Sequence, residues 1–193
     1  MVPYVIEDAG TSKEKVYDLY SRLLKDRIVF IGQEFTPDLA NSVVAQLLFL
    51  ETDDPESDII IYINSPGGLV SSCIAIYDTM NYIKPDVSTI CIGEAISAAG
   101  FILAAGTKDK RYALKNAKIM LHQISAGTQG TIQDMKIVVN EVERSNEVML
   151  NEISKITNKP VEQIKKDLDR DYYMSAGEAK EYGLIDEILT NRE

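Results

Sequence analysis

A serine placed after an expected strand is the first residue of the sequence that could do chemistry. The strand spans residues 87–92, which are rich in β-branched residues, and Ser97 follows it in the first turn of an apolar helix. The N–H groups of a first turn lack intrahelical partners, and the helix dipole favours developing negative charge there. This position suits a nucleophile. It is also the ordinary position of a serine that caps a helix, and both interpretations remain open at this point.

A glycine pair follows a second expected strand. The apolar run 58–64 leads into Gly67 and Gly68, and such a pair often serves only as a turn that needs positive φ. The functional interpretation is that the Gly68 N–H provides half of an oxyanion hole. Ligands of parallel α/β sheets bind beyond the carboxyl ends of the strands, which would bring this turn close to Ser97.

His122 is the only histidine of the chain. A Ser–His mechanism would therefore have to use His122 as its base. A lone histidine at the end of a strand is more often a structural residue, so the position alone does not decide between the two roles.

Composition restricts the classes of function. The chain has 20 Lys and Arg against 30 Asp and Glu, a formal charge of −10, which argues against nucleic acid and against an anionic membrane surface. Cys73 and Cys91 lie in apolar segments and no secretory h-region is present, which predicts a reducing, cytoplasmic setting. One histidine and two buried cysteines are too few for a zinc site, and the apolar runs are too short to span a bilayer. With 193 residues and 45% hydrophobic content, we expect one domain over residues 1–193.

Strands and helices are expected to alternate along the chain. Helices are predicted from a capping box at Thr11 and Glu14 through Leu24, from Thr36-Pro37 to Leu50, from Leu69 to about Ile83, after Pro160, and from a capping box at Ser175 and Glu178 to Tyr182. Strands are predicted at 27–32, 58–64, 87–92 and 184–189, with a hairpin formed by 111–114 and 118–123. This alternation indicates an α/β fold with right-handed crossovers.

One predicted helix is unusually long. Residues 132–156 would extend on the order of 37 Å at 1.5 Å per residue, more than a compact domain of this size can cover. Its apolar positions form one stripe that needs a partner. Either the helix is an arm that packs against another subunit, or it is a splayed surface helix.

Several motifs in this order and spacing resemble the ClpP family of serine peptidases. They are Ile63-Asn-Ser-Pro-Gly-Gly68, Gly93 to Gly106, Met120-Leu-His-Gln123, Asp169-Arg170-Asp171 and Tyr182-Gly-Leu-Ile-Asp186. The resemblance runs from about Val2 to Leu189. It implies a ClpP/crotonase-like spiral of βαβ units. A long helix would protrude from it as a handle at about 123–157, and residues 1–12 would form a mobile N-terminal segment.

The resemblance also implies the roles of the site residues. Ser97 would be the nucleophile, His122 the general base and Asp171 the residue that orients the imidazole, with oxyanion amides from Gly68 and Ala98. No metal and no cofactor are implied. The sequence departs from the family pattern where Ala98 replaces the usual Met, and where Ile124 and Ala126 replace the Pro and the first Gly of His-Gln-Pro-x-Gly-Gly.

By the same resemblance, two stacked heptamers would enclose a chamber in which unfolded polypeptides are cleaved, with the handle between the rings. Asp169 and Arg170 resemble the charged contact between rings. An AAA+ unfoldase such as ClpX, ClpA or ClpC would dock on an apolar patch made of Ile60, Tyr62, Tyr82, Ile90, Ile92, Tyr112 and Leu189. The same residues could instead belong to the core or to a subunit interface.

Two other classes of protein fit parts of the sequence. A crotonase-type acyl-CoA enzyme would share the spiral and the oxyanion hole but would use paired carboxylates; Glu94 lies near Ser97, and no matched second Glu is evident. A non-catalytic ring subunit would assemble normally and would have no working nucleophile.

Overall fold

The computed structural model describes residues 3–191. Its seven-stranded sheet has the order β3-β4-β5-β6-β9, with β7 paired to β5 and β8 paired to β7. The strands are β3 Ile28–Ile31, β4 Ile59–Ser65, β5 Val87–Ile96, β6 Arg111–Leu114, β7 Lys118–Leu121, β8 Tyr172–Ser175 and β9 Glu187–Leu189. All pairs in this sheet are parallel except β7 with β8. The mixed α/β architecture expected from the sequence is confirmed.

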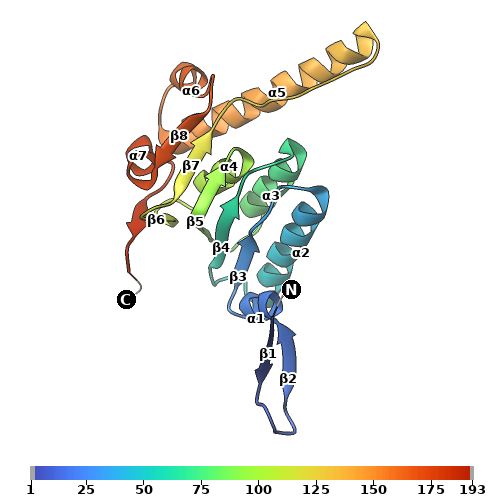
Figure 1. Ribbon diagram of the computed structural model, residues 1–193, viewed down its shortest axis with the longest axis vertical. Helices are drawn as coiled ribbons and strands as arrows, with labels where there is room; N and C mark the ends of the chain where they lie inside the picture. The colour runs from blue at the N-terminus through green and yellow to red at the C-terminus, as the bar shows by residue number, and fades with distance from the viewer. Residues whose placement is uncertain (1–2, 192–193) are drawn as a thin grey trace.

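Helices connect the parallel strands. They are α2 Pro37–Asp53, α3 Val70–Tyr82, α4 Ala98–Ala104, α5 Ile132–Thr157, α6 Val161–Asp167 and α7 Ala176–Tyr182. Helices α2 and α3 lie side by side against the sheet, and α4 follows β5 directly (Figure 1). The core between these layers is built from fully buried side chains, including those of Ile31, Phe35, Leu47, Ile61 and Phe101.

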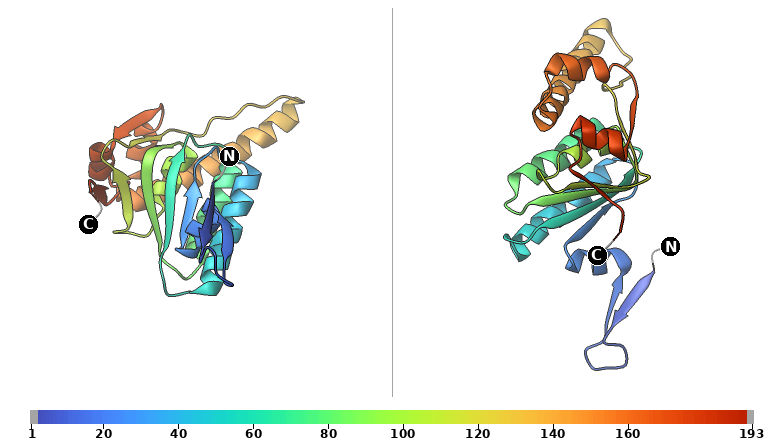
Figure 2. Two further views of the ribbon diagram at one scale, coloured as in Figure 1. Left: turned by 60° about the horizontal axis from the view of Figure 1, so that its bottom comes forward. Right: turned by 90° about the vertical axis from the view of Figure 1, so that its left-hand side faces the viewer.

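The long helix α5 leaves the body of the protein as a handle (Figures 1 and 2). Thr131 caps its first turn and Asn158 ends it in the left-handed region. Only Leu150 and Ile153 are buried, whereas Ile132 and Ile137 are each 67% exposed. Its outer part therefore presents apolar side chains to solvent in the isolated chain.

The N-terminal region differs from the prediction. Strands β1 Tyr4–Glu7 and β2 Lys15–Asp18 form an antiparallel hairpin, and helix α1 spans only Leu19–Lys25. The predicted capping box closes the hairpin turn instead: the Gly10 N–H donates to Glu14, and the Lys13 N–H donates to Thr11. Asp18 caps α1, so the helix start predicted at Thr11 was wrong. Residues 1–2 of the predicted mobile segment lie outside the described residues.

The predicted hairpin of 111–114 with 118–123 is also wrong. Both strands form, but each pairs in parallel with a different half of β5: β6 with Thr89–Cys91, and β7 with Glu94–Ile96. The register between β4 and β5 shifts beyond Ile63, where Gly93 packs so closely that a Cβ would lie 2.4 Å from Asn64 Oδ1. Across this irregular stretch the neighbour of β5 changes from β6 to β7, and β5 continues four residues beyond its predicted end, to Ile96.

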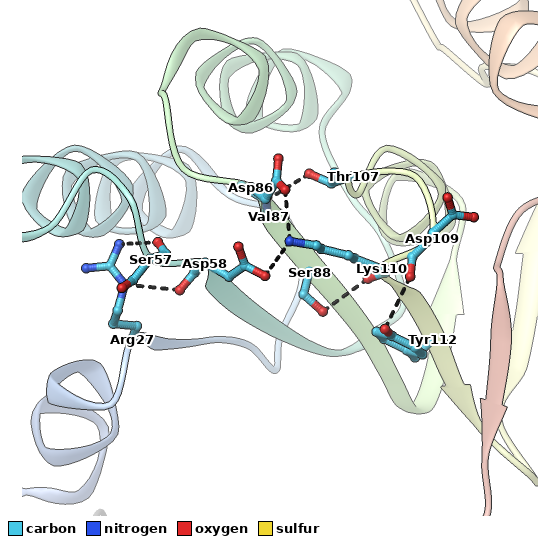
Figure 3. A network of polar contacts seen from close by, with 10 residues as sticks. All are labelled: Arg27, Ser57, Asp58, Asp86, Val87, Ser88, Thr107, Asp109, Lys110 and Tyr112. Carbon is cyan, nitrogen blue, oxygen red and sulfur yellow. Dashed lines mark hydrogen bonds and ion pairs between the residues drawn. The ribbon is translucent and has the colours of Figure 1, made fainter.

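Polar contacts hold the starting ends of the central strands (Figure 3). Lys110 Nζ lies 2.6 Å from Asp58 and 2.8 Å from Asp86, and these hydrogen bonds raise the pKa of Lys110. Arg27 donates to the carbonyls of Ser57 and Asp58 just before β4. The opposite ends of β4 and β5, at Ser65 and Ile96, are the ends next to the glycine pair and Ser97.

Candidate active site

Three of the predicted site residues form a continuous hydrogen-bonded chain. Ser97 Oγ lies 2.8 Å from His122 Nε2, and His122 Nδ1 lies 3.0 Å from Asp171 Oδ1. The His122 side chain is 24% exposed and that of Asp171 is 58% exposed. The hydroxyl, the imidazole and the carboxylate are therefore within direct reach of one another, with the carboxylate open to water on one side.

Strand pairing explains why these residues meet. Ile96 pairs with Met120 across β5 and β7, and Leu121 pairs with Tyr172 across β7 and β8. Ser97 follows Ile96, His122 follows Leu121, and Asp171 precedes Tyr172. Three segments that are far apart in the sequence thus meet at one place, where β5 and β7 end and β8 begins.

Ser97 occupies a strained turn. It is the N-cap of α4, with φ 58° and ψ −118°, and its N–H donates to the Met120 carbonyl at 2.8 Å. A positive φ in a non-glycine residue costs roughly 1–3 kcal/mol and occurs where the surrounding structure enforces it. Such a turn between a strand and a helix exposes a serine hydroxyl at the end of a sheet. From the sequence, Ser97 was expected inside the first turn of the helix, whereas in the structure it is the N-cap residue just before that turn. Its side chain makes no capping hydrogen bond.

Close packing of α4 on β7 holds this turn in place. A Cβ on Gly100 would lie 2.7 Å from the Met120 carbonyl, the group that accepts the Ser97 N–H. Beneath the helix, the Cys73 thiol donates to the Ala98 carbonyl at 3.5 Å. Burial raises the pKa of Cys73 strongly and that of Cys91 to about 11, so both thiols stay protonated and neither competes as a nucleophile.

The glycine pair brings a second set of amides to Ser97. Gly67 has φ 91° and Gly68 has φ 147°, and a Cβ on Gly67 would lie 2.5 Å from the Ile96 carbonyl. Phe35 fixes the turn, since its N–H donates to the Gly67 carbonyl and its carbonyl accepts the Leu69 N–H. Within residues 3–191, the N–H groups of Gly68 and Ala98 donate to no protein group. Both amides are therefore available to a ligand beside Ser97.

Contacts of Gln123 hold the segment that carries Asp171. The Gln123 N–H donates to the Leu168 carbonyl at 2.7 Å, and its Nε2 donates to the Asp169 carbonyl at 2.8 Å. Asp169 Oδ2 lies 3.7 Å from Arg170 Nε, and both side chains are largely exposed. From the sequence, Gln123 had no predicted role of its own. The available signal was that it directly follows His122 in the sequence.

A small, mostly apolar cavity of about 60 Å³ adjoins Ser97 and His122. Its apolar walls include Phe101, Met149 and Leu150, and its polar members include Ser125 and Asn146. Asn146 was not predicted from the sequence as a site residue. In the structure its Oδ1 accepts the Ile124 N–H at 3.1 Å. The cavity places an apolar space next to the hydroxyl.

Most residues of the predicted docking patch lie on neighbouring strands. Tyr62 pairs with Ile90, and Ile90 pairs with Tyr112. Ile60 lies two positions from Tyr62 and shares its face of the sheet, because side chains alternate along a strand. Ile92 lies just beyond Cys91, in the stretch of β5 where the pairing with β4 is irregular. Leu189 lies in β9, at the edge of the sheet, and pairs with Leu114 of β6. Tyr82 lies apart from these strands, on α3, and is 81% exposed.

Neither a metal centre nor a membrane span is found in the part of the chain that the structure describes. No three His, Cys, Asp or Glu side chains there are grouped as metal ligands. None of the helices within residues 3–191 is long and apolar enough to cross a membrane.

In a comparison with models of known protein families, one family matches nearly the whole chain. Residues 11–192 of the 193 match the family described as Clp protease. The match includes every candidate site residue described above. The chain therefore belongs to the Clp protease family, which makes it a peptidase.

Proposed function

We propose that this protein is a serine endopeptidase that uses Ser97, His122 and Asp171 as its catalytic triad. The observation that carries the proposal is the unbroken contact from Ser97 Oγ through the imidazole to the Asp171 carboxylate, with distances of 2.8 and 3.0 Å. A serine hydroxyl is a weak nucleophile until a base removes its proton. His122 is placed to be that base.

The proposed first step is the attack of Ser97 Oγ on a peptide carbonyl. His122 Nε2 takes the hydroxyl proton as the C–O bond forms, and Asp171 holds the proton on Nδ1 and stabilises the imidazolium. The tetrahedral oxyanion lies against the N–H groups of Gly68 and Ala98. One such donor contributes about 10²–10³ in rate.

The acyl-enzyme forms when the tetrahedral intermediate collapses. His122 gives its proton to the leaving amine, the C–N bond breaks, and the amino product departs. Water then attacks the ester with His122 again as base, which releases the carboxylic product and restores the Ser97 hydroxyl. Atoms and protons balance over the cycle with no cofactor.

Glu94 argues against acyl-CoA chemistry at the same site. Its carboxylate lies 3.7 Å from Lys118 Nζ, and Glu94 is not among the residues that line the cavity beside Ser97. A crotonase-type mechanism needs carboxylates facing the oxyanion site, whereas the groups that face it here are a hydroxyl and an imidazole. The contact between these two groups likewise favours an active subunit over a non-catalytic one.

The proposed setting is one domain over residues 1–193 that assembles as two stacked heptamers and receives unfolded polypeptides from an AAA+ unfoldase. The exposed apolar side chains of the handle support packing between rings. The exposed Asp169 and Arg170 are suited to a charged contact between rings. The face that carries Tyr62, Ile90 and Tyr112 is the proposed docking surface for the unfoldase.

Hydrolysis of an unfolded polypeptide tests this proposal. The wild-type protein should cleave it without nucleotide, and Ser97→Ala should not. A folded substrate should be cleaved only when an AAA+ unfoldase and ATP are added. Wild-type protein that forms rings and leaves the unfolded polypeptide intact would contradict the proposal.

A further inference from the structure

A side chain of the handle contacts the segment that follows His122. Residues 122–130 form neither helix nor strand and run along α5 (Figure 1). Asn146 Oδ1 of α5 accepts the Ile124 N–H at 3.1 Å. Only His122 and Ile124 are half-buried in this segment, whereas residues 125–130 are exposed. Asn146 therefore anchors the segment just before it becomes exposed.

Asn146 is an unexpected residue at its position in the helix. Met149, Leu150 and Ile153 follow at spacings of three, four and seven, so they share its face of α5, and all of them line the same cavity. An apolar side chain would be the ordinary choice on that face. The carboxamide instead meets a main-chain amide that has no other partner within residues 3–191.

We propose that Asn146 is a positioning residue for the peptide substrate. Successive N–H groups of an extended chain point in opposite directions. Holding the Ile124 N–H on α5 therefore turns the main-chain groups of Ser125, a residue that lines the cavity, away from the helix and toward a bound peptide. A substrate in extended conformation would pair with them as an added strand.

This inference rests on the proposed peptidase function and makes a more specific claim. Asn146 would act through Ile124 and Ser125 and would not touch the reacting atoms. Loss of the anchor would weaken the binding of peptides that extend along the segment and would leave the Ser97–His122 contact intact. The effect should therefore depend on substrate length.

The experiment compares Asn146→Leu with Asn146→Asp in the full-length assembled protein. Leu removes the acceptor at similar volume, whereas Asp keeps an acceptor oxygen. With a fluorogenic peptide of eight or more residues, Leu should lower kcat/KM about tenfold, mainly through a higher KM, the order expected when an amide loses its acceptor. Asp should retain most of the wild-type value, and so should the matched control Asn151→Leu on an exposed position of the same helix.

Two readouts separate positioning from general damage. The rate at which a small fluorophosphonate labels Ser97 should be unchanged in Asn146→Leu, because the probe does not reach the segment. In an Ile124→Pro background, which has no N–H to anchor, Asn146→Leu should have little further effect on kcat/KM. Equal losses of labelling and of peptide cleavage would overturn the inference, and so would wild-type cleavage of long peptides by Asn146→Leu. Absence of labelling and cleavage in the wild type would instead overturn the proposed function itself.

Discussion

Gly67 and Ser97 are packed so closely that a Cβ on Gly67 would lie 2.9 Å from Ser97 Cβ. The turn after β4 and the turn after β5 therefore form one unit, in which the glycine's missing side chain leaves room for the serine. Gly67 also has φ 91°, which an L-residue adopts only with strain.

We expect Gly67→Ala to lower the rate of Ser97 labelling and of peptide cleavage by about 10²-fold or more, because either turn must move and active-site misplacements of about 1 Å have effects of this size. The far-UV circular dichroism should stay close to that of the wild type. Gly177→Ala in helix α7 is the matched control, since its new Cβ would lie in ordinary contact with its neighbours, 3.9 Å from Ser175 Oγ. Equal activity of both variants would contradict the proposed role of this turn.

His122→Ala and Asp171→Ala should each reduce kcat by about 10⁴–10⁶, because His122 takes the proton from Ser97 and Asp171 orients the imidazole and stabilises the imidazolium. The double variant should be hardly worse than His122→Ala alone, since groups that act as one unit have non-additive effects. Steady-state kinetics on one peptide checks this, with ring assembly followed by size measurement. Multiplying losses in the double variant would show that the two residues act independently.

Arg111 and Asp186 form an ion pair that joins the start of β6 to the segment before β9. The side chains are 7% and 17% exposed, with 2.6 Å between Arg111 Nη2 and Asp186 Oδ1. Asp186→Asn leaves the buried guanidinium without its counter-charge, and we expect a loss of about 3–5 kcal/mol in the free energy of unfolding. Denaturant unfolding at fixed protein concentration measures it; a change below about 1 kcal/mol would contradict the prediction.

The same pair predicts a dependence of stability on pH. Burial alone would raise the pKa of Asp186, but hydrogen bonds from Arg111 outweigh it and hold that pKa below its ordinary value. A carboxyl with a lowered pKa in the folded state stabilises the fold above its unfolded pKa, near 4, and this contribution is lost as the pH falls through the folded pKa. The difference in stability between wild type and Asp186→Asn should therefore shrink below about pH 4. A constant difference down to pH 2 would contradict this assignment.

The exposed apolar face of α5 predicts the behaviour of the assembly. Ile137→Asp should shift the sedimentation profile from two rings toward one ring or smaller, because a charge would have to be buried between handles. Gln133→Asp, at another exposed position near the start of α5, adds the same charge and serves as a comparison. Intact double rings in Ile137→Asp would contradict the proposed packing of the handle.

Local signals in the sequence predicted most elements of the fold correctly. Thr36 with Pro37 marked the start of α2, and Ser175 with Glu178 formed the capping box that starts α7. These features act within one turn of chain. The errors lie at the N-terminus, where a helix start was predicted and a hairpin turn forms, and at β6 and β7, for which a hairpin was predicted. In both places the turn residues are compatible with either structure. At β6 and β7, pairing with the distant strand β5 decides which structure forms.

The residues of the candidate site could be proposed from the sequence only in part. Ser97 and Gly68 were candidates because they follow predicted strands, and His122 because it is the only histidine, whereas Asp171 came only from the family resemblance. The positive φ of Ser97 could not be predicted, because the contacts that hold its turn involve a distant segment: the Met120 carbonyl accepts the Ser97 N–H and packs against Gly100 of α4. Asn146 was missed because its partner is a main-chain amide 22 residues away.

Labelling of the assembled protein with a fluorophosphonate, followed by intact mass, tests the central claim most directly. The wild type should gain one adduct per chain, located at Ser97 by peptide mapping, and its peptide cleavage should stop in proportion to labelling. Ser97→Ala should gain none, and His122→Ala should react far more slowly. Peptide cleavage that persists in fully labelled rings, or in Ser97→Ala, would contradict the account.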